Sequence, residues 1–529
     1  MNSTPQPGDP TPLDRAAAFA RRWFDAAFFL LALPFLWKAS RNIAATLQFE
    51  DALIVLRYAR NIASGEGFVF NPGERVLGVT TPLHTLVSAL YVAIGGEHAA
   101  VIQNVAGIVF LLLTAWMTTR IVRQGHSLAL SGLMAIVILA NLNFNYLYFG
   151  METHSFAFLT LLAFHLFTQR REVATGVVLG IAFLTRYDAA LLALLIGLVL
   201  LFERRKVPWR LVVAFTLVVT PWLVFSLWYF HSILPNALSA KKDYFPVLGY
   251  LRFVFDYYRG FFANMVGLTT SNELIKTTIA WLFPLICLPG IYRMTKTAWD
   301  NLVLITYSAG LVLVYSLIGP DPRFHWHYYI LNPVLTMLFL VGLYEILRVA
   351  LHGTLRVISR LTRHETTTAA RLATTIPIGI AAVLAMIHVN RGLDYKFQLD
   401  PHSKQLYAIA DWLNQHYDDD TSLLQPSIGI LGYATNMRII DHAGLVTEGL
   451  YYYDGVQHTP MMEVLARHQP DLVLVLAGAE GALAQHGYAQ RMTFHDPLEY
   501  VLYALAADAP DTPQGTSLDT SQDPGGAPR

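Results

Sequence analysis

Two adjacent carboxylates, Glu50 and Asp51, stand where the first long apolar stretch of the sequence ends. Charged groups at the edge of a bilayer are costly unless they find partners or take part in function. A carboxylate held there could act as a general base that accepts a proton from a reacting group within hydrogen-bond reach. The same pair could instead only cap the helix that follows, since carboxylates are favoured at helix N-termini.

A short helix with one polar face is expected after this pair, and it carries Arg57, Tyr58 and Arg60. Arg57 follows Glu50 by about two helical turns, so the two side chains share one helix face. An ion pair between them therefore fits the spacing as well as a ligand contact does. Adjacent helical residues point about 100° apart, so we expect only one of Glu50 and Asp51 to face a substrate.

Later segments between apolar stretches hold further polar residues that packing does not explain. Glu152 directly precedes an apolar stretch, where it could bind a ligand or a metal or could only start a helix. Arg186 and Asp188 are close enough in sequence to pair with each other or to bind a ligand. The histidines show no metal-ligand spacing such as H-E-x-x-H, so the sequence names no metal site.

The composition indicates a polytopic membrane protein. Of the 529 residues, 54% are hydrophobic and only 14% are charged, whereas soluble domains are about a quarter charged. The 37 basic and 37 acidic residues give no net charge, so nothing suggests a nucleic-acid partner. The single cysteine, Cys287, excludes an intrachain disulfide.

Apolar stretches of roughly 17–25 residues can cross a bilayer, and the sequence predicts about eleven such spans. They are 23–46, 98–121, 128–148, 153–169, 173–188, 189–203, 208–230, 276–294, 299–319, 327–349 and 373–390. The run 81–95 is short and follows a proline, so we expect an interfacial helix there that does not cross.

The Lys/Arg bias of the short loops sets the orientation. If the N-terminus is cytoplasmic, every basic cluster falls in a cytoplasmic loop. The clusters are Arg120/Arg123, Arg170/Arg171, Arg204/Arg205/Lys206, Arg293/Lys296 and Arg356/Arg360/Arg363/Arg371. This predicts a multi-pass protein of the bacterial inner membrane whose C-terminal domain is outside. The carboxylate pair, Glu152 and the 186–188 corner then share the outer face.

The chain divides into four predicted regions. A cytoplasmic tail (1–22) precedes a membrane domain (23–390) with a first outer loop at 47–97, and a small extracytoplasmic α/β domain covers 391–507. Within that domain, Ser403–Tyr417 and Met461–Arg467 predict helices, and Ser427–Leu431, Arg438–Asp441 and Asp471–Leu476 predict strands. The tail 508–529 is rich in Pro, Gly, Asp and Ser and is predicted to be disordered.

An ordered set of short motifs covers most of the chain. The motifs are Phe49-Glu50-Asp51-Ala52, Arg57-Tyr58-Ala59-Arg60-Asn61, Gly65-Glu66-Gly67-Phe68, Thr80-Thr81-Pro82-Leu83, Gly150-Met151-Glu152-Thr153, Leu184-Thr185-Arg186-Tyr187-Asp188, Leu234-Pro235-Asn236, Arg323-Phe324 and Ile440-Asp441-His442. Together they resemble the GT-C glycosyltransferases, and most closely the group of the mycobacterial terminal arabinofuranosyltransferases. The family usually has Asp-Asp where this chain has Glu50-Asp51, and commonly Pro where it has Tyr187. The first departure leaves open which carboxylate is the base.

The resemblance implies an inverting sugar transfer from a polyprenyl phosphate, with arabinofuranose as the first candidate sugar. The acceptor would be an envelope glycan, a lipid or a protein. Asp51 would be the base, because it coincides with the second acid of the family pair, and Glu50 would orient it or bind the acceptor. The leaving group is already a phosphate, so cations or a divalent metal (Mg, Mn or Ca) could stabilise its charge.

For such a reaction, the residues on the predicted outer face supply the remaining candidate contacts. The donor phosphate contacts would be Lys241, Arg323, Arg57 and Arg186, with Lys241 and Arg323 favoured. The other substrate contacts would be Glu152, Asp188, Asn236, Tyr58 and His442. Two rival functions remain: a transporter or flippase of a lipid-linked precursor, and a polymerase or ligase with a diphosphate-linked donor. Transporters commonly place charges near the bilayer midplane and carry internal repeats, and neither feature is visible in this sequence.

Overall fold

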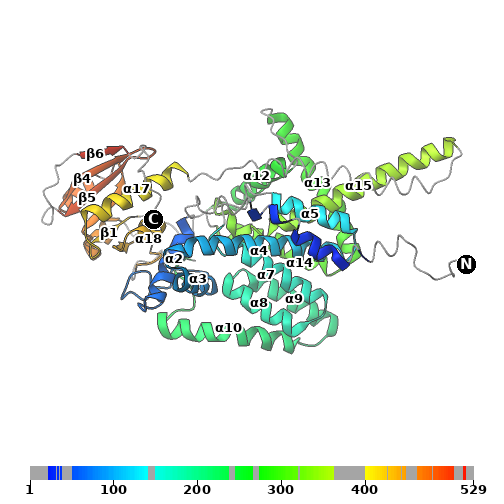
Figure 1. The fold of residues 1–529 in the computed structure, drawn as a ribbon, viewed down its shortest axis with the longest axis horizontal. Helices are drawn as coiled ribbons and strands as arrows, with labels where there is room; N and C mark the ends of the chain where they lie inside the picture. The colour runs from blue at the N-terminus through cyan, green and yellow to red at the C-terminus, as the bar shows by residue number, and fades with distance from the viewer. Residues whose placement is uncertain are drawn as a thin grey trace, which may run out of the picture.

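The computed structural model describes residues 19, 22–30, 32–34, 36–37, 50–140, 149–237, 245–265, 273–319, 322–362, 400–425, 427–441, 444–447, 461–478, 480–505 and 516–519. Two parts stand out in these residues. A bundle of long helices occupies most of the molecule, and a small α/β domain sits at one end of it, at the left of Figure 1.

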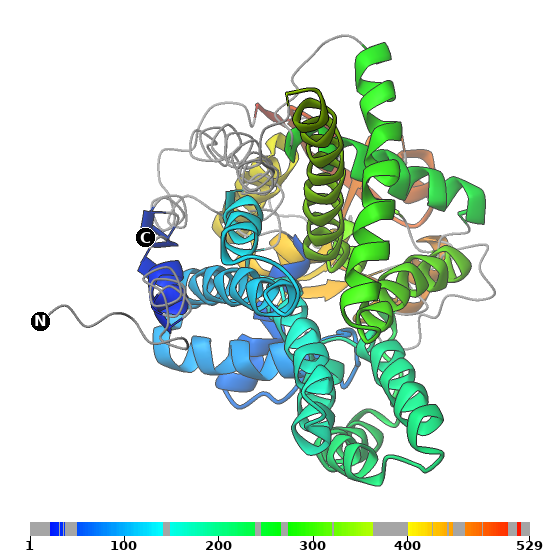
Figure 2. The same cartoon turned by 90° about the vertical axis from the view of Figure 1, so that its right-hand side faces the viewer.

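Long apolar helices form the bundle (Figures 1 and 2). They are α4 (Ala99–Val122), α5 (Leu128–Ala140), α7 (Thr153–Thr168), α8 (Glu172–Thr185), α9 (Ala189–Arg204), α10 (Trp209–Phe230), α12 (Val247–Met265), α13 (Glu273–Thr297), α14 (Asn301–Ile318) and α15 (Leu331–Thr362). Several of them end within a few residues of the end of an apolar run, whereas α15 continues past its run to Thr362. α14, for example, stops at Gly319, whose φ of +73° is readily adopted only by glycine.

Four helical stretches within the described ranges have the length and apolar composition to cross a membrane. They are Pro82–Val122, Trp209–Phe230, Asn301–Ile318 and Leu331–Thr354. The predicted helical membrane protein with a small C-terminal α/β domain is thus confirmed, whereas the count of about eleven spans stays a prediction. The predicted span 373–390 and the last part of 23–46, residues 38–46, lie outside the described residues.

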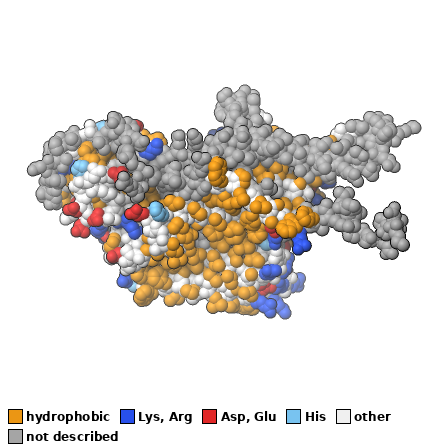
Figure 3. Space-filling model, in the orientation of Figure 1, with side chains coloured by type: hydrophobic (Ala, Val, Ile, Leu, Met, Phe, Trp, Pro, Cys, Tyr) orange, Lys and Arg blue, Asp and Glu red, His pale blue; other side chains and the backbone are white. Residues whose placement is uncertain are grey.

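The surface of the bundle suits lipid. Phe202, Leu217 and Trp228 are 76%, 70% and 69% exposed, and such apolar exposure is expected where acyl chains replace water. Figure 3 shows hydrophobic side chains across the middle of the visible face, with Lys and Arg gathered at the end away from the α/β domain. The orientation of this end toward the cytoplasm stays a prediction from the loop charges.

Two short helices join the bundle to the α/β domain. α2 (Glu50–Ala63) starts with the carboxylate pair, and α3 (Pro82–Gly95) packs on it. A single-turn helix, η1 (Gly96–His98), separates α3 from α4. Leu53 and Leu56 of α2 are buried in one hydrophobic cluster with Ile430 and Val446 of the α/β domain. The carboxylate pair is therefore anchored to the α/β domain as well as to the bundle.

The α/β domain is built on one mixed sheet. Its elements are α17 (Pro401–His416), β1 (Ser422–Leu424), α18 (Ile428–Ala434), β2 (Arg438–Ile440), α19 (Met461–His468), β3 (Leu472–Leu476), α20 (Glu480–Gln485), β4 (Tyr488–His495), β5 (Tyr500–Leu505) and β6 (Thr516–Asp519). The strand order is β2-β1-β3-β5-β4-β6. β1 runs parallel to β2 and β3, and β5 runs antiparallel to β3 and β4.

Two sequence predictions for this domain are wrong. The predicted strand Ser427–Leu431 is the helix α18, because Gly429 and Gly432 lie one turn apart and form the face that packs on α2 and the residues after it. A strand would place them on opposite faces. Within the tail predicted to be disordered, residues 516–519 form β6, which pairs with β4.

Candidate active site

A cavity of about 350 Å³ lies where α2, the bundle and the α/β domain meet. The polar residues in its lining are Asp51, Thr80, Thr81, Glu152, Arg186, Tyr187, Asp188, Tyr315, Trp326 and His327. Its size falls in the usual range of small-molecule pockets, about 300–1,000 Å³. The structure thus brings together four residues that the sequence predicted on one membrane face, namely Asp51, Glu152, Arg186 and Asp188.

Arg186 is the centre of a buried polar network on the cavity wall. Its Nη1 donates to Oε1 of Glu152 at 2.9 Å, its Nε to Oδ2 of Asp188 at 2.7 Å, and its Nη2 to the Tyr315 hydroxyl at 3.2 Å. Arg186 and Glu152 are only 6% and 4% exposed. One guanidinium therefore binds two carboxylates. Of the two possibilities that the sequence left open for Arg186 and Asp188, the structure shows the pair.

The local backbone explains this network. Arg186 ends α8 in an extended conformation, and Asp188 precedes the first residue of α9 without a side-chain capping bond. The Asp188 carboxylate is therefore available to Arg186 and to the Tyr315 hydroxyl, which donates to its Oδ1. With Asp51 included, these charged residues of the lining carry three negative charges and one positive charge.

The sequence did not single out Tyr315. It lies near the end of α14, and its ring stacks on the ring of His327 with centroids 4.6 Å apart. The only signal was a tyrosine near the end of a predicted span, a position at which tyrosines are common in membrane proteins. Its role in tying α14 to the 186–188 corner depends on contacts between residues far apart in sequence.

The carboxylate pair is divided between two surroundings. Asp51 lines the cavity. Oε1 of Glu50 accepts a hydrogen bond from the backbone N–H of Gly429 in α18, at 3.2 Å. One side chain therefore lines the cavity and the other contacts the α/β domain, as their angular separation on a helix predicts.

Arg57 does not fit its predicted contact with a donor phosphate. It is 1% exposed and donates to three backbone carbonyls: Nε to Phe70 at 2.9 Å, Nη2 to Met437 at 2.6 Å, and Nη1 to Gly432. These carbonyls occupy its donors on three sides. The guanidinium joins the segment after α2 to the α/β domain behind the cavity, so in this structure Arg57 has a structural role.

Tyr58 and Asn236 also lie behind the cavity wall. The Tyr58 hydroxyl donates to the Val76 carbonyl at 2.8 Å and accepts from the Gly78 N–H at 3.1 Å. It thereby holds the segment 78–81, which lines the cavity. The Asn236 side chain donates to the Gly444 carbonyl at 3.2 Å, next to Leu445 of the cavity lining. Both residues position the wall, and a direct substrate contact stays a prediction for each.

The predicted contacts that remain are Arg323, Lys241 and His442. Arg323 is exposed and lies just before η3 (His325–Tyr328), which supplies Trp326 and His327 to the cavity. Lys241 and His442 lie outside the described residues.

A metal held by protein ligands alone does not fit the described part of the site. Divalent cations such as Mg²⁺ and Ca²⁺ need about six or more oxygen ligands. In the residues that the structure describes, no group of three or more His, Cys, Asp or Glu side chains could hold a metal ion. Glu152 and Asp188 already bind Arg186. A divalent cation that also takes oxygen ligands from a donor phosphate and from water stays a prediction.

A bundle of membrane helices with a carboxylate-lined cavity beneath an α/β domain defines a class of fold found in solved glycosyltransferases. ArnT from Cupriavidus metallidurans is similar over 94% of this chain and 100% of its own, at 15% identity and a TM-score of 0.57. The oligosaccharyltransferase AglB from Archaeoglobus fulgidus, solved with an inhibitory peptide and a dolichol-phosphate, is similar over 93% of this chain and 75% of its own. That match has 12% identity and a TM-score of 0.51.

These matches confirm, at the level of the fold, the resemblance to GT-C glycosyltransferases. Arabinofuranosyltransferase AftD from mycobacteria is similar over 93% of this chain and 40% of its own, at 14% identity. Its TM-score of 0.46 is too low to bear on the sugar, so the arabinofuranosyltransferase subgroup stays a prediction. Residues 395–514 match a family described as a domain of unknown function, DUF8728. No curated protein matches the sequence.

Proposed function

We propose that this protein is an integral-membrane glycosyltransferase that moves one sugar from a polyprenyl phosphate to a hydroxyl of an envelope glycan, lipid or protein. The observation that carries the proposal is the position of Asp51, in a cavity that also holds the Glu152–Arg186–Asp188 network. The fold supports the same class of reaction. AglB, which has this fold, was solved with dolichol-phosphate, and this favours a lipid phosphate as the donor here.

In the proposed reaction, Asp51 accepts the proton of the acceptor hydroxyl while the hydroxyl oxygen attacks the anomeric carbon of the donor. The bond between that carbon and the phosphate oxygen breaks, and the electron pair leaves with the polyprenyl phosphate. A single displacement of this kind inverts the anomeric centre. The phosphate is already a good leaving group, so no acid is needed to protonate it.

The network around Arg186 would bind the sugar. Glu152 and Asp188 are acceptors that Arg186 holds in fixed positions, and fixed acceptors can orient sugar hydroxyls without reorganisation during the reaction. We propose Arg323 and Lys241 as the phosphate contacts, since Arg186 is already bound to two carboxylates. Arabinofuranose is the first sugar to test, because of the sequence motifs.

The test is an assay for cleavage of the donor by the full-length protein in lipid nanodiscs. Short-chain prenyl phosphates that carry labelled arabinofuranose or a hexose are supplied, with membranes of a deletion strain as the source of acceptor. Wild-type protein should release prenyl phosphate and label an acceptor, and Asp51→Asn should lower the rate by about 10²–10⁴-fold, the usual contribution of a general base. A folded Asp51→Asn protein with wild-type activity contradicts the assignment of the base. Movement of an intact donor across vesicles without cleavage would instead identify a flippase.

A further inference from the structure

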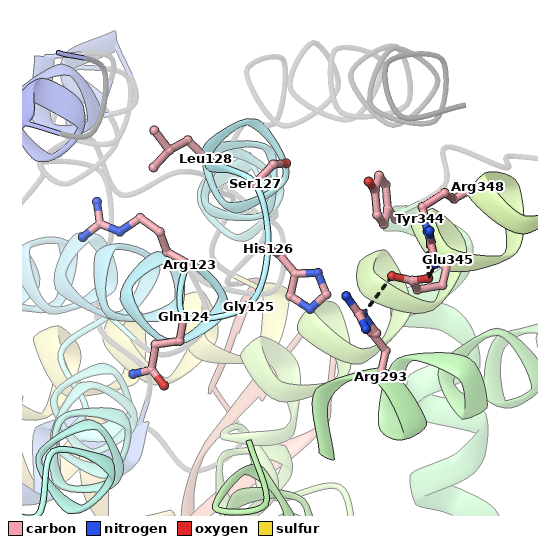
Figure 4. Close-up of a pocket in the computed structure, with 10 residues that line it drawn as sticks. All are labelled: Arg123, Gln124, Gly125, His126, Ser127, Leu128, Arg293, Tyr344, Glu345 and Arg348. Carbon is pink, nitrogen blue, oxygen red and sulfur yellow. Dashed lines mark hydrogen bonds and ion pairs between the residues drawn. The ribbon is translucent and has the colours of Figure 1, made fainter. Parts of the chain in front are cut away.

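A second cavity, of about 920 Å³, lies at the end of the bundle away from Asp51. Figure 4 shows the residues that line it. Helix α7 separates the two cavities, since Glu152 of the first precedes it and Gln124 of the second contacts its last residue, Thr168, at 3.4 Å. α7 has 16 residues, so its two ends lie about 24 Å apart. The second cavity is therefore distinct from the candidate active site.

Close helix packing places the charged residues of this cavity. Gly290 of α13 and Gly342 of α15 each face a backbone carbonyl of the other helix, with no room for a Cβ. The two backbones therefore touch. One turn further along each helix, Arg293 and Glu345 come face to face, with Nε and Oε1 3.1 Å apart.

The turn between α4 and α5 forms the opposite wall. Gly125 in this turn packs so closely on Thr297, the last residue of α13, that a side chain would not fit. Arg123 and His126 flank this glycine and line the cavity. Three separate elements thus bring cationic or polar side chains to one space, and the small residues at their contacts hold the cavity in shape.

Positive charge is in excess here. Glu345 pairs with two arginines. Arg293 is one, and Nη2 of Arg348 donates to the same carboxylate at 2.7 Å. Arg123 forms an ion pair with Asp25 at 3.3 Å, and Arg120 of α4 pairs with the same carboxylate. Among the described residues, the cavity lining together with Asp25 and Arg120 contains four arginines and two carboxylates. Arg293 and Arg348 keep 39% of their side-chain surface exposed, so a ligand can reach them.

We propose that this cavity binds a phosphate-bearing anion through Arg293 and Arg348, with Arg123 opposite. Guanidinium groups bind phosphate oxygens in bidentate geometry, and each group has five N–H donors, more than one shared carboxylate can occupy. An anionic phospholipid headgroup and a soluble phosphate share this chemistry. The lipid is favoured, because Ile346 and Val349, next to Glu345 and Arg348 on α15, are 39% and 63% exposed and offer apolar surface to an acyl chain.

The test measures binding to the full-length, delipidated protein by native mass spectrometry. One arm adds phosphatidylglycerol, a second adds phosphatidylcholine, and a third adds inorganic phosphate as a competitor. We expect phosphatidylglycerol to bind at one saturable site with at least about tenfold preference over phosphatidylcholine. Retention of the lipid against millimolar inorganic phosphate identifies a lipid site, whereas displacement of the lipid or binding of phosphate alone identifies a site for a soluble anion.

Three variants decide whether the arginines form the site. The double variant Arg293→Gln/Arg348→Gln should bind phosphatidylglycerol at least about tenfold more weakly, since charge-assisted bonds are lost. Glu345→Gln should bind it more tightly, because a competitor for both arginines is removed while all cations remain. Arg205→Gln, an exposed cation after α9 at the same end of the bundle, is the matched control and should match wild type. Wild-type affinity in the double variant, or unchanged or weaker binding in Glu345→Gln, overturns the proposal.

Discussion

The backbone N–H of Gly429 donates a hydrogen bond to Oε1 of Glu50 across 379 residues of chain, at 3.2 Å. A Cβ at Gly429 would collide with the backbone carbonyl of Glu50, so α18 and the start of α2 are in direct contact. The first carboxylate of the pair therefore belongs to the joint between the two domains, and the second belongs to the cavity.

Glu50→Gln should leave sugar transfer within a few-fold of wild type, because a neutral amide oxygen can still accept the Gly429 N–H bond. Asp51→Asn, the neighbouring and equally conservative change, should remove most of the activity. Donor cleavage rates of both purified variants are the measurement. Equal losses in the two variants would show that both carboxylates take part in proton transfer, and a loss confined to Glu50→Gln would reverse the assignment.

Arg186→Gln should destabilise the protein strongly, by about 3–5 kcal/mol, because it leaves buried carboxylates without their counter-charge. Glu152 and Asp188 are the carboxylates affected. The matched control is Arg170→Gln, since Arg170 also holds two carboxylates but with 42% of its side chain exposed. Its cost should stay below about 1 kcal/mol. Denaturant unfolding of the detergent-solubilised proteins compares the two, and similar costs would contradict the buried network.

Arg57→Met should lower the free energy of unfolding by at least about 3 kcal/mol, because three buried carbonyls lose their donor at about 1–3 kcal/mol each. Arg60→Met is the control on the same helix. Arg60 is only partly buried and donates to one carbonyl, that of Tyr433, at 3.2 Å. We expect it to cost about 1 kcal/mol. A stable Arg57→Met protein with a raised KM for the donor would restore the phosphate role that the sequence suggested.

Gly78→Ala should displace the α/β domain from the cavity. A Cβ there would lie 2.6 Å from the Leu445 carbonyl oxygen and 2.8 Å from the Tyr58 hydroxyl. Limited proteolysis should cut the variant faster near residue 445, and donor cleavage should slow. Gly197→Ala is the control, because Gly197 lies in α9 with open space around its Cβ position among the described residues. Alanine there should be neutral or stabilise by up to about 1 kcal/mol.

The sequence predicts those parts of this fold that depend on local pattern. Long apolar runs give the membrane helices, and polar residues at the ends of those runs give Asp51, Glu152, Arg186 and Asp188 of the cavity lining. The wrong predictions for α18 and for Arg57 arise where segments far apart in the sequence meet. α18 has an alternation of Ile and Gly that is typical of a strand, and only its contact with α2 explains its helical glycine spacing.

Arg57 shows the same limit for the site. An arginine on a polar helix face beside a predicted donor site is a reasonable phosphate ligand on sequence grounds. Its acceptors, however, are backbone carbonyls, which no sequence pattern marks, and two of them lie in a domain that begins more than three hundred residues later. Tyr315 shows the opposite error, because the sequence passed over it. Its position at a helix end is ordinary, and only its hydrogen bond to Asp188 connects it to the site.

The carbonyls that Arg57 binds lie far apart in the chain: Phe70 follows α2, and Gly432 and Met437 belong to the α/β domain. Synthesis proceeds from the N-terminus, so α2 leaves the ribosome long before two of these acceptors exist. Until residues 432–445 have been synthesised, the guanidinium lacks two of its acceptors and the cavity lacks its Leu445 wall. The bundle can assemble early, but we expect the site to be completed only with the α/β domain, and a nascent chain inserted in the membrane should therefore be inactive until these residues have been made.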